Sequence, residues 1–299
     1  ITYCHYCKYA IINRMKNIAV IYHKNCRDGV ASAWVCYQKF AETAEYIAAD
    51  DRKQLPDFVT NHNNISELEV YIVDFCYPKE ILLTLEAKCK KLVVLDHHIS
   101  QKEDIESVRE HVYGTDKSGC MLAWEYFYRG QAAPLAIRYV SDSDTWEHKM
   151  PDYQYIDAYI YKDDSELNIQ SFDKVVKELE DPTRFEYTKN IGKVLREVRE
   201  GMINKYIERA TLVNVFGYEV YAVNAPSEIK SELGHELAKK TGTFAVVYYY
   251  YEGKWRLSLR SIDDFDVSII AAAHGGGGHK NAAAIHIACE DPLLKILNN

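Results

Sequence analysis

Asp96, His97 and His98 follow directly on the apolar run 92–95. Two imidazoles and a carboxylate in succession are too polar to be packing residues, and they are well suited to bind a divalent metal. They stand at the point where a buried strand would reach the surface. This sequence therefore predicts a metal-binding group at the end of a strand.

The same change from apolar to polar residues occurs twice upstream. The run 70–73 leads into Asp74, and the run 18–22 leads into His23, with Asp28 shortly after. Continuous apolar runs separated by helical stretches are typical of strands buried on both faces of a parallel sheet. Because the carboxyl ends of such strands lie along one edge, where open α/β sheets bind ligands, these side chains are expected in one crevice.

Carboxylates that are brought together in a partly desolvated crevice repel one another unless cations neutralise them. Asp74 is flanked by the other two polar strand ends, so it could bridge two ions about 3.5 to 4 Å apart and help to activate a water molecule. A single His or Asp of this kind is more often a cap or a surface group, but several at one edge favour a metal site. The candidate residues are His23, Cys26, Asp28, Asp74, Asp96, His97, His98, Asp142 and Asp144.

A run of four glycines, Gly275, Gly276, Gly277 and Gly278, leads into His279 near the end of the chain. A glycine run is usually a flexible linker. Here it lies inside a compact segment, which favours a nest of backbone amides that binds an anion.

Arg260 is expected at the end of the preceding strand, where its guanidinium could bind a phosphate in a bidentate manner. The alternative for Arg260 is a solvated strand terminus.

The length of 299 residues and an ordinary hydrophobic share predict two domains. The net charge of −8 disfavours a surface that follows long duplex DNA and favours a short anionic substrate. No apolar run approaches the roughly 20 residues needed to cross a bilayer, so no membrane contact is expected. The 8 cysteines are scattered, which is typical of reduced thiols in a cytoplasmic protein.

Cys4 and Cys7 resemble half of a zinc knuckle, but no second pair follows at ligand spacing, so residues 1–15 are expected to form an N-terminal extension instead. Residues 16–181 alternate strand and helix, with helices expected over 28–40 and 79–90, from Ser118, and from Pro134. This alternation predicts a doubly wound parallel sheet with right-handed crossovers.

Residues 182–213 are charged and are predicted to form a helical connector. Residues 214–299 are predicted to form a smaller α/β domain with a mixed sheet, including a hairpin of strands 243–251 and 255–260. The active site is expected in the cleft between the two domains.

The order of these motifs resembles that of the DHH phosphoesterase superfamily with its DHH-associated C-terminal domain. The matching segments are His23 to Gly29, Val73-Asp74, Asp96-His97-His98, Asp142 to Trp146, and Gly275 to His279. The resemblance implies a two-domain, manganese-preferring hydrolase of phosphodiester or phosphoanhydride bonds.

The resemblance also assigns roles within the N-terminal part. His23 and Asp28 would be ligands from the first motif, Asp74 the bridging ligand, and His97 a ligand of the second ion. His98 would face the scissile phosphate.

Asp96 would not bind the metal itself but would contact a metal ligand and orient it. Asp144 fits the fourth-motif ligand, with Asp142 as the rival, and the segment from Gly275 to His279 would hold the far end of the substrate.

Cys26 departs from the family pattern, because the family commonly has an aspartate there. A thiol is a softer ligand, so at the first of the two expected manganese sites it could shift the preference towards zinc or iron, or leave that site weak. The sequence thus predicts a metal-dependent phosphodiesterase that hydrolyses short single-stranded oligonucleotides or dinucleotides. The alternatives are a pyrophosphatase or polyphosphatase, and a catalytically silent nucleotide-binding module.

Overall fold

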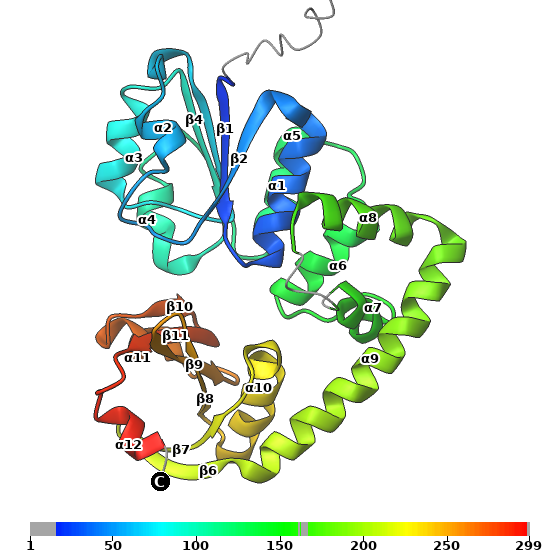
Figure 1. Cartoon of the computed structure of the whole chain (residues 1–299), viewed down its shortest axis with the longest axis vertical. Coiled ribbons are helices and arrows are strands. Elements are labelled where there is room, and N and C mark those ends of the chain that lie inside the picture. The colour runs from blue at the N-terminus through cyan, green and yellow to red at the C-terminus, as the bar shows by residue number, and fades with distance from the viewer. Residues whose placement is uncertain (1–15, 161, 163–166, 298–299) are drawn as a thin grey trace, which may run out of the picture.

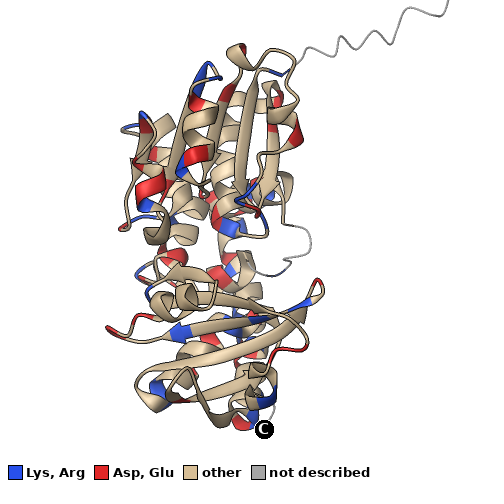
Figure 2. Ribbon diagram, turned by 90° about the vertical axis from the view of Figure 1, so that its left-hand side faces the viewer, with Lys and Arg blue, Asp and Glu red and all other residues tan. Residues whose placement is uncertain are grey.

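The computed structural model describes residues 16–160, 162 and 167–297. Two α/β domains are joined by one long helix, which runs along the side of the molecule (Figure 1). The expected N-terminal extension and the Cys4–Cys7 pair lie outside the described residues. In the ribbon of Figure 2, acidic and basic residues are intermingled along both domains.

The N-terminal domain is built on a five-stranded sheet in which every pair of neighbouring strands is parallel, in the order β2-β1-β3-β4-β5. The order of strands reverses at β1, which lies between β2 and β3, as in a doubly wound sheet. The predicted fold class is confirmed. The strands are β1 (Ile18–His23), β2 (Ala44–Ala49), β3 (Glu69–Val73), β4 (Lys91–Asp96) and β5 (Glu110–Tyr113).

The central strands of this sheet are apolar on both faces because both faces are covered by helices. Val93 and Leu95 of β4 belong to one hydrophobic cluster, while Leu92 and Val94 belong to the cluster on the opposite face. All four are buried. Complete burial of such a side chain contributes about 1.5–3 kcal/mol, so the strands that end at the polar residues are firmly anchored.

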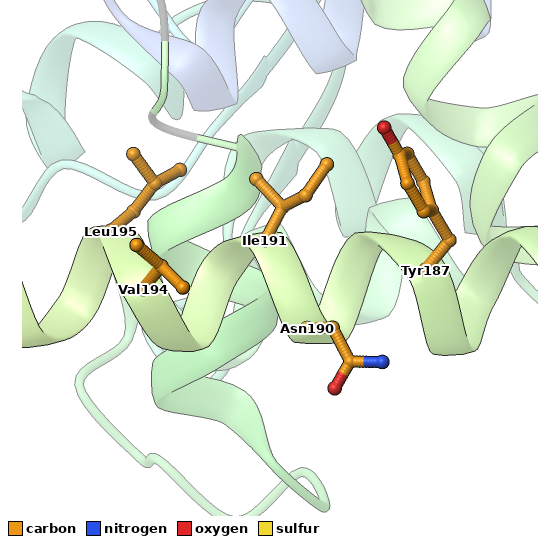
Figure 3. Close-up of a pocket in the computed structure, with 5 residues that line it drawn as sticks. All are labelled: Tyr187, Asn190, Ile191, Val194 and Leu195. Atoms are coloured by element: carbon orange, nitrogen blue, oxygen red, sulfur yellow. The ribbon is translucent and has the colours of Figure 1, made fainter.

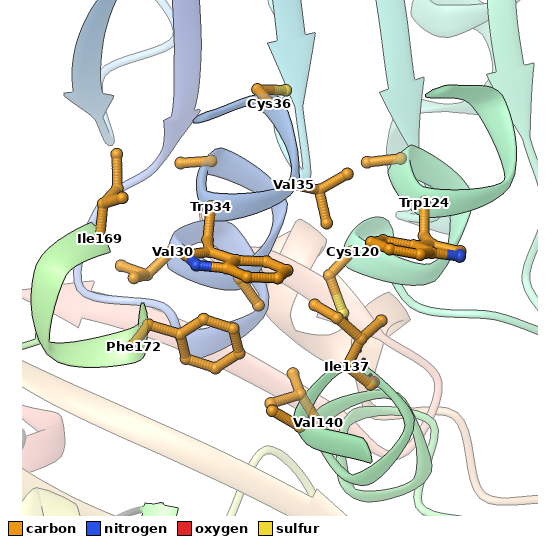
Figure 4. Packing of buried hydrophobic residues seen from close by; sticks show 14 of the residues in the cluster. Val30, Trp34, Val35, Cys36, Cys120, Trp124, Ile137, Val140, Ile169 and Phe172 are labelled. Carbon is orange, nitrogen blue, oxygen red and sulfur yellow. Dashed lines mark hydrogen bonds between the residues drawn. The ribbon is translucent and has the colours of Figure 1, made fainter. Parts of the chain in front are cut away.

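Most helices of this domain lie on one face of the sheet, and the helices α2, α3 and α4 lie on the opposite face (Figure 1). The core of the larger face includes Trp34 and Phe172, whose rings meet edge to face at 5.9 Å (Figure 4). Trp34 Nε1 also donates a hydrogen bond of 3.0 Å to Asp173. The helices of this domain are α1 (Arg27–Phe40), α2 (Asp57–Thr60), α3 (Lys79–Glu86), α4 (Lys102–Ile105), α5 (Gly119–Phe127), α6 (Leu135–Asp144), α7 (Tyr153–Ile160) and α8 (Ile169–Glu180).

The connector is the 28-residue helix α9 (Pro182–Arg209). Its start is capped by Asp181, whose carboxylate accepts hydrogen bonds from the amides of Thr183 and Arg184. At Gly192 the helix passes so close to α7 that a Cβ atom would lie 1.8 Å from the carbonyl oxygen of Tyr155.

A shallow apolar groove on α9 is lined by Tyr187, Asn190, Ile191, Val194 and Leu195 (Figure 3). None of the candidate site residues lines it. None of the helices in the described part of the chain combines the length and the apolar character that a membrane span requires.

The C-terminal domain contains a mixed six-stranded sheet in the order β10-β11-β9-β8-β7-β6, in which only β7 and β8 are parallel neighbours. Helix α10 packs on one face, and α11 and α12 cover the other. The strands are β6 (Thr211–Val215), β7 (Tyr218–Asn224), β8 (Phe244–Tyr251), β9 (Lys254–Ser261), β10 (Gly277–His279) and β11 (Ala282–Ile287). The helices are α10 (Lys230–Thr241), α11 (Val267–Ala273) and α12 (Leu293–Leu297).

The glycine run is more ordered than the sequence suggests. Gly277, Gly278 and His279 form the edge strand β10, which pairs with β11. The amides of Gly275 and Gly276 donate to the carbonyl oxygens of Ala272 and Ala271 at the end of α11. These two amides cap a helix, so the segment is neither a flexible linker nor an open loop.

Candidate active site at the edge of the parallel sheet

The candidate metal ligands of the N-terminal domain come together because β1, β3 and β4 are neighbours in the sheet. Their carboxyl ends deliver His23, Asp74 and the pair Asp96-His97 to one edge. Asp28 joins them from the first turn of α1, which begins just beyond β1. The side chains of Asp28, Asp74, Asp96 and His97 are all buried.

Asp74 occupies the centre of the site in an unusual backbone conformation, with φ at +52°. Left-handed φ values are uncommon for residues other than glycine, although Asp and Asn tolerate them best. The amide of Asp74 donates a hydrogen bond of 2.9 Å to the carbonyl of Leu95, which ties the turn to β4. Such strain is typical of a functional position.

The Asp74 carboxylate is buried, and neither oxygen has a hydrogen-bond partner among the residues that the structure describes. The nearest cationic groups are His97 Nε2, 3.3 Å from Oδ1, and His23 Nδ1, 3.6 Å from Oδ2. Burial opposes ionisation, yet these imidazoles hold the pKa of Asp74 well below its usual value. A buried, ionised and incompletely paired carboxylate is what a cation would neutralise.

Asp28 is held by the N-terminus of α5. Its two oxygens accept hydrogen bonds from the amides of Gly119 and Cys120, where the helix dipole favours negative charge. The approach is so close that a Cβ atom on Gly119 would lie 2.6 Å from Cβ of Asp74 and 3.0 Å from Asp28 Oδ2. Only glycine fits there.

His97 lies among three carboxylates. Its Nε2 atom is 3.3 Å from Asp74, 3.5 Å from Asp144 and 3.6 Å from Asp28. Burial lowers the pKa of His97, but the three carboxylates outweigh that effect and raise it to about 10. Burial and the repulsion from Asp74 and Asp144 raise the pKa of Asp28 to about 8. Without a bound cation, the cluster therefore retains protons.

Asp96 orients the two histidines that follow it. Its Oδ1 atom lies 2.7 Å from His98 Nδ1 and accepts the amide of His97 at 2.7 Å. Asp96 is fully buried. A carboxylate that holds an imidazole in this way fixes its ring orientation and tautomer.

Asp142 and Asp144 have different surroundings. The Asp142 carboxylate accepts the amides of Lys149 at 2.7 Å and Met150 at 3.1 Å, so it stabilises the loop after α6. Asp144 forms a potential metal-binding group with Asp28 and His97, and its side chain is 30% exposed. The geometry therefore favours Asp144 over Asp142 as a ligand.

His279 reaches the site from the C-terminal domain. Its ring stacks on His98 with centroids 4.8 Å apart and an interplanar angle of 24°, and it lies 5.3 Å from the ring of His97. Burial and the two neighbouring imidazoles lower the pKa of His279 to about 4, so the ring is neutral at neutral pH. The site is thus shared by both domains.

Among the residues that the structure describes, four groups of side chains have ligand atoms close enough together to hold a metal ion. Asp74 belongs to two of these groups, and His97 belongs to three, so the groups are fused into one cluster. Their oxygen, nitrogen and sulfur atoms suit a divalent cation, and the oxygens of Asp74, which accept no hydrogen bond from the described residues, fit the same conclusion. The groups are His23-Cys26-Asp74, Asp28-His97-Asp144, Asp74-Asp96-His97-His98 and His97-His98-His279.

Arg260 is not at an exposed strand end. Its guanidinium donates to the hydroxyl of Ser231 at 3.1 Å and to the carbonyl of Leu259 at 2.9 Å. Burial lowers the pKa of Arg260 to about 10. In the sheet register, Arg260 pairs with Ala282, which in turn pairs with His279, so Arg260 and His279 point to the same face.

Two of the four glycines are required where β10 and β11 approach each other. A Cβ atom on Gly276 would lie 2.0 Å from the carbonyl oxygen of Ala284, and one on Gly278 would lie 2.5 Å from that of Ala282. These glycines therefore allow the strand that carries His279 to lie tightly against β11.

Comparisons with known proteins agree with this architecture. Residues 211–299 match the model of the DHHA1 domain. An uncharacterized protein of Acanthamoeba polyphaga mimivirus is 28% identical over 93% of the chain and 69% of its own length. Oligoribonuclease NrnB of Bacillus subtilis is 32% identical over 85% of the chain and 63% of its own length.

The fold is also similar to a crystal structure of an exopolyphosphatase-related protein from Bacteroides fragilis. The TM-score is 0.55 at 14% identity, and the alignment covers 95% of this chain and 91% of that one. This similarity extends over both domains. The C-terminal part of the chain therefore matches the DHHA1 domain, and most of the chain is similar in sequence to oligoribonuclease NrnB.

Proposed function

We propose that the protein is a metal-dependent phosphodiesterase that hydrolyses short single-stranded oligonucleotides or dinucleotides. The observation that carries the proposal is Asp74, whose buried carboxylate accepts no hydrogen bond from the described residues and is shared by two potential metal-binding groups. The similarity of the chain to oligoribonuclease NrnB supports a short nucleic acid as the substrate.

Two divalent ions, with manganese as the first choice, would be held by His23, Asp28, Asp74, His97 and Asp144. When bound, such ions lower the pKa of a coordinated water and stabilise negative charge on a phosphoryl group. The cluster fits this role because its three carboxylates otherwise repel one another.

The protein's own residues would orient the phosphate. His98, held by Asp96 at 2.7 Å, would donate a hydrogen bond to a phosphate oxygen from the N-terminal domain. His279, whose ring stacks on that of His98, would donate a second hydrogen bond from the C-terminal domain. Arg260 would bind the far end of the substrate, whereas the amides of Gly275 and Gly276 are already used to cap α11.

Cys26 makes the choice of metal open to zinc or iron. Its thiol is grouped with His23 and Asp74. Burial and the nearby carboxylates raise the pKa of Cys26 well above its usual value, so the thiol is protonated until a cation compensates. The six cysteines in the described ranges are free thiols, which supports the proposed reducing, cytoplasmic environment.

The test is hydrolysis of a dinucleotide, a cyclic dinucleotide and pyrophosphate by the purified protein with manganese. Cleavage of the dinucleotide is expected, with loss of activity after chelation. Hydrolysis of pyrophosphate alone would instead support the phosphatase suggested by the Bacteroides fragilis protein. Tight binding without turnover would support a silent nucleotide-binding module.

Replacement of Asp74 tests the assignment of the central ligand. Asp74→Ala and Asp74→Asn are both expected to abolish turnover, and Asn retains a tolerance for the left-handed backbone. Asp264→Ala is a suitable control because Asp264 is fully exposed and pairs only with Lys280 at the surface. Near-normal turnover in both Asp74 variants would contradict the proposal.

A further inference from the structure

An aromatic cluster begins two residues after the proposed ligand Asp144 and reaches helix α10, and none of the proposed roles uses it. We define the aromatic cluster as Trp146, His148, Tyr153 and His235. The ring of Trp146 lies 4.5 Å from that of His148 and 5.5 Å from that of His235. His148 stacks on Tyr153 at 4.3 Å with an interplanar angle of 6°.

The position of Trp146 is fixed by the loop that follows the ligand Asp144. The amide of Trp146 donates to the carbonyl of Ser143 at 3.1 Å, and the Asp142 carboxylate holds the loop three and four residues further on, at the amides of Lys149 and Met150. Trp146 and His148 both have left-handed backbones, with φ values of +58° and +54°. Two such residues in one loop are unfavourable, which is typical of a functional segment.

The indole of Trp146 is 44% exposed, whereas those of Trp34 and Trp124 are 4% and 9% exposed. The face of an exposed indole gains free energy when another aromatic surface covers it. Trp146 is separated from the proposed ligand Asp144 by only one residue, so its backbone is held close to the metal-binding cluster. A ligand whose phosphate binds there would bring its neighbouring groups to this ring.

Helix α10 links the aromatic cluster to the proposed phosphate-binding arginine. His235 contacts Trp146, while Ser231, one turn earlier, accepts a hydrogen bond from Arg260. A Cβ atom on Gly234 would lie 2.7 Å from the Arg260 side chain. The same two turns of α10 therefore contact both an aromatic face and a guanidinium on the side of the sheet that carries His279.

We propose that Trp146 is a stacking platform for one nucleobase of the substrate, with His235 at its edge. The platform rests on the proposed function: the metal-binding cluster would bind the phosphate, and Trp146 would bind the base. Every base has a π face, so such a platform selects nucleotides over pyrophosphate without strong preference among bases.

Intrinsic fluorescence tests the platform without any turnover. Adenosine 5′-monophosphate, with magnesium present, should quench the fluorescence of the wild-type protein, and ribose 5-phosphate should not. Trp146→Phe should lose the quenching. The matched control is Trp255→Phe, because Trp255 packs on the opposite face of the C-terminal sheet, and it should retain the quenching. Quenching that persists in Trp146→Phe would overturn the proposal.

Kinetics separate stacking from a structural role of the loop. Trp146→Leu should raise KM for a dinucleotide about tenfold or more with little change in kcat, and Trp146→Phe should restore most of the affinity. On an analogue in which hydrogen replaces the base, Trp146→Leu and the wild type should behave alike. Equal losses on both substrates, or a loss confined to kcat, would contradict stacking.

The outcomes also distinguish this inference from the proposed function. If the wild-type protein cleaves no dinucleotide with any metal, the proposed function is wrong, while the fluorescence result still decides whether Trp146 contacts a base. If dinucleotides are cleaved but Trp146→Leu has no selective effect on base-bearing substrates, only the platform is wrong.

Discussion

Gly119 determines how closely α5 approaches the carboxylates of Asp28 and Asp74. A methyl group there would lie 2.6 Å from Asp74 Cβ and would displace one or both side chains. Gly119→Ala is therefore expected to weaken metal binding at least tenfold. Changes to residues that orient metal ligands typically lower metal affinity by about 10- to 100-fold. Titration calorimetry with manganese would measure it.

The control variant adds the same methyl group at a glycine that has no close neighbours. No heavy atom lies within 4 Å of a Cβ built on Gly201 of α9. Gly201→Ala should leave metal binding unchanged and stabilise the helix by up to about 1 kcal/mol. Unchanged metal affinity in Gly119→Ala would show that the cluster can relax around the extra group.

Cys26 provides a second test at the scale of one residue. Cys26→Asp restores a hard oxygen ligand in the group with His23 and Asp74, so we expect affinity for manganese to rise and affinity for zinc to fall. In the wild-type protein, added cobalt should give a thiolate-to-metal absorption band that is absent from Cys26→Asp. A cobalt spectrum that is the same in both proteins would show that the sulfur is not a ligand.

Much of the site can be predicted at this scale because its ligands follow apolar runs along the chain. His23, Asp74 and His97 are found in this way, since each stands at the end of a strand. Asp142 and Asp144 cannot be separated from sequence, because the choice depends on which carboxylate the loop amides of Lys149 and Met150 engage. The role of Gly119 arises from contacts with residues far away along the chain.

At the scale of elements, the packing of α9 against α7 depends on Gly192. A Cβ atom there would lie 1.8 Å from a backbone oxygen of α7, which cannot move without shifting the helix. Gly192→Ala should destabilise the protein by about 1–3 kcal/mol, the usual cost of overpacking. Urea denaturation would measure this change, and Gly201→Ala in the same helix should show no such loss.

The elements that can be predicted are those with continuous apolar faces. The runs in β1, β3 and β4, the helices α1 and α9, and the β8–β9 hairpin are all evident from the sequence. The edge strands β2 and β5 are not, because most of their residues are only half-buried and their apolar pattern is weak. Strand β10 is missed for a different reason, since glycine has low strand propensity and pairs here only because β11 lies against it.

At the scale of the whole molecule, metal binding should be linked to stability. The carboxylate cluster joins β1, β3, β4, α1 and α6, so a cation that binds only the folded state stabilises all of them together. At a concentration 100 times Kd, the gain is about 2.7 kcal/mol. Differential scanning calorimetry should show a higher midpoint with manganese than with a chelator.

The Asp74→Ala variant completes this experiment. Without the central carboxylate, the manganese-dependent rise should be greatly reduced. The variant with chelator should also be less stable than the wild type with chelator, because it loses the attraction to His23 and His97 that lowers the pKa of Asp74. An equal rise in both proteins would place the metal elsewhere.

Strand β10 is an edge of the C-terminal sheet, and it lies against residues 99–101 of the N-terminal domain. Uncovered sheet edges are templates on which a foreign chain can add a strand, and this is a common route to aggregation. The contact between the domains therefore shields the strand that carries His279 from unwanted pairing. Three residues with two glycines also make a poor template for strand addition, so the edge is protected by its own sequence as well.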